Sequence, residues 1–156
     1  MFKKLMLLVL TGFLAACAGP GEVREGNRAD EMAVYERHAG AAESWVRFTN
    51  IRNWQAVGFH SVVLELGGSR HYLVKLIGAC DLELNSGVTL RLITSRRNVL
   101  SDFDKVVVGG QPCQIQSIHR LDYQAVQAEL ESEGEPVPDR QDGVSVESQD
   151  QSSGGT

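Results

Sequence analysis

Alternating apolar and polar side chains mark the middle of the chain and predict β-strands. Residues 62–66 and 71–76 alternate on either side of the glycine-rich turn 67–69, which is the pattern of an antiparallel hairpin. Four further segments are rich in strand-forming residues: 44–48, 88–94, 105–108 and 113–118. In the last of these the alternation changes phase after Gln116, which predicts a β-bulge at that point.

Two helices are expected to flank the strands. Asn27 can cap a helix over 28–39, and Gly40 is placed to end it. A closing helix is expected over 121–131, with Asp122 as its cap. Its apolar positions recur at i, i+3 and i+7: Tyr123, Val126 and Leu130.

These elements predict one small, mainly β domain over residues 28–130. We expect a five- or six-stranded antiparallel meander or a partly closed barrel, with short flanking helices. Residues 17–27 are glycine-rich and lack an apolar period, so they are expected to form a flexible tether. Residues 131–156 carry seven acidic residues, one arginine and no aromatic residue, so they are expected to be a disordered acidic tail.

The first sixteen residues have the layout of an export signal. Lys3 and Lys4 precede the apolar run 5–14, which ends in the small residues Ala15 and Ala16. The run is too short to cross a membrane, because a transmembrane helix needs about 20 apolar residues. Residues 1–16 are therefore predicted to be a signal peptide.

The string Leu14-Ala15-Ala16-Cys17 resembles the lipobox of bacterial lipoproteins. That resemblance implies that the Cys17 thiol receives a diacylglycerol and that the chain is cut before Cys17. Two or three acyl chains make a stable membrane anchor. The next residue is Ala18 and not an aspartate, which by the same resemblance favours the outer membrane, with the domain facing the periplasm. The alternative is an ordinary secretory signal with an incidental cysteine.

The formal net charge of −5 argues against nucleic acid as a partner, because phosphates require a basic surface. The expected partners are the membrane, through the lipid on Cys17, and an envelope protein or cell-wall component.

Cys80 and Cys113 are the cysteines that remain after Cys17 is lipidated. An even pair in an oxidising compartment usually forms a disulfide, which would stabilise the domain by about 3.5 to 4 kcal/mol in the loop-entropy account. The alternative is a redox-active or metal-binding pair. The chain has no Cys-x-x-Cys motif, so a structural disulfide is favoured.

Trp45 and Trp54 are both expected to lie in the core, because tryptophan on an apolar face is mostly buried. The alternative for either ring is stacking on a sugar or a peptide. Arg96 and Arg97 are expected to be plain surface, with binding of an anion or a lipid head group as the alternative.

No enzyme template is complete in the sequence. Gly-x-Ser-x-Gly and the phosphate-binding loop are both absent. Asp102 and Asp104 flank Phe103, which is typical of turn chemistry rather than of a catalytic carboxylate pair. The chain is therefore expected not to be an enzyme and to need no cofactor.

Three histidines offer an alternative metal site. If the predicted hairpin pairs in register, His60 and His71 are expected to approach each other, and His119 could complete a zinc site with them. No ligand spacing supports this site, and solvated strand-edge histidines are the simpler interpretation.

A scattered set of residues resembles the DUF6491 family, a group of exported proteobacterial proteins of unknown function. The resemblance covers residues 35–122 and rests on the order of several short pieces: 38–40, Trp54, 70–76 leading to Cys80, 103–106, 113–115, Ile118 and 121–122. It implies a small exported domain in which the two cysteines pair. It implies no activity, cofactor or catalytic residue.

The sequence therefore favours an outer-membrane lipoprotein whose domain is a non-enzymatic binding module. A sheet face or an exposed strand edge would bind the partner protein or envelope component. The alternative is a small periplasmic enzyme or metal protein that uses His60, His71 and His119.

Overall fold

The computed structural model describes residues 20–77, 89–134 and 143–148. The described elements follow in chain order: α1 (Pro20–Arg37), β1 (Ala39–Glu43), β2 (Trp45–Arg47), β3 (Ile51–Val57), β4 (Ser61–Leu66), β5 (Arg70–Ile77), β6 (Leu90–Thr94), β7 (Val99–Ser101), β8 (Lys105–Val108), β9 (Gln111–Leu121), α2 (Tyr123–Glu133) and β10 (Val144–Ser148). The expected mainly β class is confirmed.

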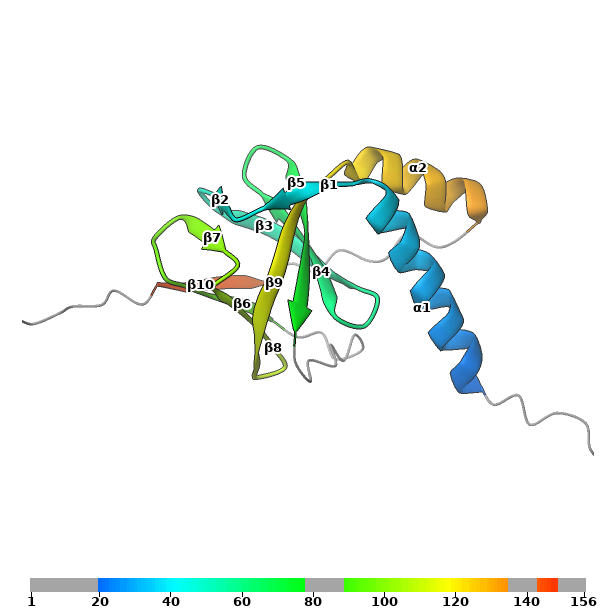
Figure 1. Cartoon of the computed structure of the whole chain (residues 1–156), viewed down its shortest axis with the longest axis horizontal. Helices are drawn as coiled ribbons and strands as arrows, with labels where there is room; N and C mark the ends of the chain where they lie inside the picture. The colour runs from blue at the N-terminus through cyan, green and yellow to red at the C-terminus, as the bar shows by residue number, and fades with distance from the viewer. Residues whose placement is uncertain (1–19, 78–88, 135–142, 149–156) are drawn as a thin grey trace, which may run out of the picture.

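Eight of the described strands form one sheet that curls into a nearly closed barrel (Figure 1). The order is β10-β6-β8-β9-β5-β4-β3, and β1 joins at β9. All pairs are antiparallel except β10 with β6. The two ends of the order, β10 and β3, contact each other, and this contact brings the sheet close to closure.

β9 is the longest strand and has partners on both edges. One edge pairs with β5, and the other pairs first with β8 and then with β1. Lys75 lies opposite Ser117 and Leu76 lies opposite Ile115, so Gln116 is an extra residue on β9. The bulge predicted from the sequence is confirmed, and it lies between the β8-paired and β1-paired parts of the strand.

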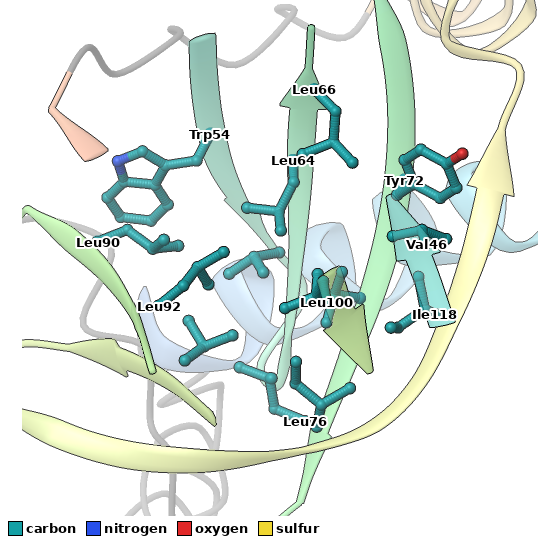
Figure 2. Packing of buried hydrophobic residues seen from close by; sticks show 14 of the residues in the cluster. Val46, Trp54, Leu64, Leu66, Tyr72, Leu76, Leu90, Leu92, Leu100 and Ile118 are labelled. Atoms are coloured by element: carbon teal, nitrogen blue, oxygen red, sulfur yellow. The ribbon is translucent and has the colours of Figure 1, made fainter. Parts of the chain in front are cut away.

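The inside of the barrel is filled by apolar side chains (Figure 2). Trp54 is 4% exposed, as expected, and lies beside Leu90 in this view. β2 and β7 form a separate two-stranded sheet that adds Val46 and Leu100 to the same cluster. Each fully buried aliphatic side chain contributes about 1.5 to 3 kcal/mol, so this cluster is the main stabilising core.

The outer face of the barrel carries a second core beneath the helices. Val57, Val63 and Leu73 point outward from β3, β4 and β5, and they pack against α1 and α2. The helices contribute Val34, Tyr35, Val126 and Leu130, among others. Ser61 to Leu64 of β4 are buried at every position, as expected where both faces of a strand are covered.

The closing helix forms with its predicted cap and buried face, but it spans Tyr123–Glu133 rather than 121–131, because Leu121 belongs to β9. The Asp122 side chain accepts a hydrogen bond from the Ala125 backbone N–H, and Gly134 ends the helix at φ 73°. This left-handed conformation suits glycine because no Cβ clashes with the backbone.

The N-terminal helix is longer than expected. It begins at Pro20, so the predicted flexible tether is wrong over residues 20–27. Proline is favoured in the first turn of a helix, where its missing N–H costs nothing. The helix ends at Arg37, before the expected end at Ala39, because Ala39 pairs with Leu121 in the new strand β1.

The acidic tail is not wholly disordered. Residues 144–148 form β10, which lies parallel to β6 with Val144 opposite Leu90. Val144 packs against the barrel core, and Arg91 forms an ion pair with Glu147. Local composition missed this strand because its stabilisation comes from the edge of β6.

Some predictions lie outside the described residues: the signal peptide 1–16, Cys17 and Cys80. Within the described part of the chain, neither helix is long and apolar enough to span a bilayer.

Candidate functional site

A groove of about 520 Å³ opens where α2 meets the β4–β5 turn. Its walls come from three separate parts of the sequence: the α1–β1 junction, the β4–β5 hairpin and the β9–α2 junction. Its lining residues are His38, Gly40, Ser69, His71, Arg120, Leu121, Asp122, Tyr123 and Gln124. A groove of this volume is large enough for a small molecule or a short segment of a partner.

The end of β9 brings these three parts together. Leu121 pairs with His71 on one side and with Ala39 on the other. The Asp122 backbone N–H donates to the carbonyl of His38 at 3.1 Å. The groove therefore sits on paired backbone rather than on long loops.

The back wall of the groove is an aromatic stack. The rings of His71 and Tyr123 lie 4.4 Å apart, with 12° between their planes. On β4, Glu65 lies opposite His71, and its Oε2 is 3.9 Å from His71 Nε2. The imidazole is thus held between an aromatic ring and a carboxylate.

A buried hydrogen-bond chain supports this wall from behind. The Tyr123 hydroxyl donates to Gln55 Oε1 at 3.0 Å, and Gln55 Nε2 donates to the Tyr35 hydroxyl. A cavity of about 10 Å³ lies between this chain and His71, which is room for one water molecule at most. Tyr123 is therefore fixed by α1 and β3 together.

Burial raises the pKa of Tyr35, and the neighbouring Tyr123 and Glu31 add to the shift. The Tyr35 phenol consequently stays neutral. A neutral hydroxyl that both accepts from Gln55 and lies fully inside the second core is a structural group, not a proton donor to the groove.

Charges near the groove are mostly engaged in structural bonds. His38 Nε2 lies 2.5 Å from Glu129 Oε2, and Arg37 pairs with the other oxygen. Hydrogen bonds from Arg37 and His38 hold the pKa of Glu129 below its usual range. Arg120 is exposed and forms no ion pair with a described side chain, so its charge is available to a ligand.

The three histidines of the alternative metal site lie apart. The turn at 67–69 places His71 opposite Glu65, whereas the His60 carbonyl accepts from Leu76 at the other end of the hairpin. The expected approach of His60 to His71 is therefore wrong. No three metal-ligating side chains cluster anywhere in the described ranges.

His119 has a separate structural role. Its Nδ1 lies 2.9 Å from the Gly40 carbonyl and its Nε2 lies 2.9 Å from Ser117 Oγ. Nδ1 thus joins β9 to Gly40 of β1, while Nε2 contacts Ser117 on β9 itself, next to the bulge. Neither His119 nor Ser117 lines the groove.

Trp45 departs from the expectation of burial and is 55% exposed. Asp104 has the predicted turn role: its carboxylate accepts from Ser101 N at 2.7 Å, Ser101 Oγ at 2.9 Å and Ser95 N at 2.7 Å. Arg96 and Arg97 are exposed, as predicted.

The sequence did not reveal the chain of Tyr35, Gln55 and Tyr123. Both tyrosines are visible in the sequence only as apolar-face residues of helices, and Gln55 has no motif around it. The three residues meet because two helices pack on one outer face of the barrel, which requires knowledge of the tertiary fold.

The fold and groove define a small barrel-like β domain with two helices over one face. The chain belongs to the DUF6491 family of unknown function, whose family model matches residues 1–137. No curated protein and no solved structure matches the chain. Several residues that carried the family resemblance line the groove: His38, Gly40, His71, Leu121 and Asp122.

Replacing Tyr35 with Phe tests the buried chain. The change leaves Gln55 Nε2 without its acceptor in a buried site, so we expect the free energy of unfolding to fall by about 1 to 2 kcal/mol. Urea unfolding followed by tryptophan fluorescence measures it. Tyr72→Phe is the matched control, because Tyr72 is also buried and its hydroxyl bonds to no described residue. Equal losses of unfolding free energy in the two variants would contradict a stabilising role for the buried hydrogen-bond chain.

Replacing Glu129 with Gln tests the link between α1 and α2. The lowered pKa of Glu129 means that its carboxylate stabilises the fold above its unfolded pKa of about 4.3. That contribution is lost as the pH falls through the folded pKa. We expect Glu129→Gln to be less stable than the parent at neutral pH. The difference should shrink as the pH falls below about 4.3 and vanish below the lowered folded pKa.

Urea midpoints measured across this pH range provide the comparison. Glu133→Gln serves as the control, because Glu133 is exposed on the same helix. A stability difference for Glu129→Gln that did not change with pH would show that the charge of Glu129 is not what joins the helices.

Proposed function

We propose that this protein is an outer-membrane lipoprotein, anchored through Cys17, whose barrel-like domain is a non-enzymatic binding module facing the periplasm. The groove beside Tyr123 and His71 is its binding surface. The observation that carries the proposal is the structure of the groove. Its aromatic wall is held by internal hydrogen bonds, and Arg120 beside it forms no ion pair with a described side chain.

The ligand suited to this groove carries an acidic group. Arg120 offers a planar guanidinium that binds carboxylate or phosphate in two-point geometry. His38 and Asp122 are engaged with Glu129 and with the α2 cap, so neither competes for the arginine. An acidic group of a partner protein or of an envelope component meets this requirement.

Binding is favoured over catalysis because the groove histidines serve the structure. His71 is stacked on Tyr123 and faces Glu65, while His38 is bound to Glu129. Nucleophilic catalysis requires a base positioned on a hydroxyl or thiol at the substrate. Ser117 and His119 have such a contact, but they lie outside the groove lining.

The groove replaces the contact surfaces expected from the sequence. One sheet face lies inside the barrel, and helices cover the outer face over β3 to β5. The edges β10 and β3 contact each other. The fold thus leaves less sheet face and edge for strand addition than an open meander would.

A disulfide between Cys80 and Cys113 belongs to the same proposal. Ile77, at the end of β5, pairs with Gln114, the residue after Cys113. Cys80 follows Ile77 by three residues, a length of extended chain that reaches about 10 Å. That reach suffices for the Cα separation of about 4.4 to 6.8 Å that a disulfide requires.

Metabolic labelling with palmitate tests the anchor. We expect the chain to incorporate label and Cys17→Ser to incorporate none, because the acceptor thiol is lost. Cys113→Ser is the control and should incorporate label like the parent. Labelling that persists in Cys17→Ser would refute the lipid anchor, whatever the domain binds.

Photo-cross-linking in intact cells tests the groove. A photoreactive residue at Gln124, which is exposed and lines the groove, should give a defined adduct identified by mass spectrometry. We expect Arg120→Ala to reduce the adduct by about tenfold, the loss of one charge-assisted contact. Arg52→Ala removes an exposed arginine elsewhere and should leave the adduct unchanged. Adducts insensitive to Arg120 would contradict the proposal.

A further inference from the structure

A second pocket lies away from both helices. Its volume is about 220 Å³, and its lining residues are Ser44, Trp45, Ser95, Arg96, Val99, Ser101, Asp102 and Phe103. It is built around β2 and β7, which Figure 1 shows on the side of the barrel opposite to α1 and α2. The groove and this pocket share no lining residue.

Two aromatic side chains border this pocket and face solvent. Trp45 is 55% exposed and Phe103 is 82% exposed. The Arg47 guanidinium lies 5.7 Å from the centre of the Trp45 ring, which orients the indole by a cation–π contact. An aromatic ring that stays exposed does not gain the favourable free energy of burial. A pair of such rings at one pocket therefore indicates a binding surface.

The floor of the pocket is rigid. The buried Asp104 carboxylate fixes Ser95 and Ser101 through their backbone N–H groups. Gln114 Nε2 donates to the Asp102 carbonyl at 2.7 Å and to the Asp104 carbonyl at 3.2 Å. The turn that carries Phe103 is therefore tied to the barrel from beneath, and the aromatic rings extend from a fixed base.

Asp102 borders the pocket with a half-buried carboxylate. Asp102 Oδ1 is shielded from solvent and accepts no hydrogen bond from a described residue. Because Oδ1 is shielded, a ligand in the pocket would reach Asp102 through the rest of its half-buried carboxylate. The pocket therefore combines aromatic side chains with the Asp102 carboxylate and the hydroxyls of Ser44 and Ser95.

We infer that this pocket binds one saccharide ring of an envelope glycan. The apolar C–H face of a pyranose packs on the electron-rich face of an aromatic ring, and its hydroxyls donate to a carboxylate such as that of Asp102. The volume admits one ring with its substituents rather than a drug-sized ligand. The choice of an envelope glycan rests on the proposed periplasmic location.

Saturation-transfer NMR on the purified full chain in detergent tests this inference. The two probes are a soluble N-acetylglucosamine trisaccharide, which represents cell-wall glycan, and the delipidated core oligosaccharide of lipopolysaccharide. We expect transfer to the ring C–H protons of at least one probe, and the probe that responds identifies the source. No transfer to either probe at millimolar concentration would overturn the inference.

Variants then assign the binding to this pocket. Trp45→Ala is expected to weaken binding by about tenfold, and Trp45→Phe should retain most of it because a ring remains. Asp102→Ala should weaken binding similarly, because the carboxylate is lost. The turn should stay intact, because the variant keeps the backbone carbonyl that accepts from Gln114. Undiminished binding in Trp45→Ala would overturn the assignment. Palmitate labelling of Cys17 is independent of these results, so a failed anchor and a failed sugar site are distinguishable.

Discussion

The backbone of β9 forms hydrogen-bonded ladders with β5, β8 and β1, and the rest of the molecule is arranged by that pairing. Buried backbone groups must be paired, so a strand of eleven residues in the middle of a sheet needs partners along both edges. β8 is too short to supply the whole second edge, and β1 completes it. The bulge at Gln116 separates the two regions, and the strand end that follows it holds α1, α2 and the groove together.

Covering both faces of β4 and β5 sets the second constraint. The inner face is lined by apolar side chains. The outer face mixes Val63 and Leu73 with Glu65 and His71, and Gln55 of the neighbouring strand β3 lies on the same side. Polar groups beneath a helix require partners, and the helices supply them as Tyr35 and Tyr123. The same packing that buries the helices thus creates the hydrogen-bond chain behind the groove.

Features that depend on neighbouring residues were predictable from the sequence. The alternation of 62–66 and 71–76, the phase change at Gln116 and the Asp122 cap each appear in the structure as expected. These signals arise from local side-chain direction and local hydrogen bonding.

Features that depend on distant partners were not predictable. β10 forms because β6 offers an unpaired edge, and its sequence alone resembles a disordered tail. His60 and His71 were misplaced because the turn register, not their composition, decides which residues face each other. Trp45 is exposed because β2 has β7 as its one partner among the described strands. A pattern of five residues does not reveal that position.

The buried chain of Tyr35, Gln55 and Tyr123 is more informative about function than about stability. Replacing a fully satisfied polar group together with its partners by apolar residues of similar shape is often nearly neutral, so leucine-like packing could hold the helices equally well. Polar bonds differ from apolar packing because they fix direction. Here the fixed direction is that of the Tyr123 ring, on which His71 stacks at the groove. We therefore interpret this hydrogen-bond chain as the feature that orients the wall of the groove. It connects the core of the domain to the face that we propose binds the ligand.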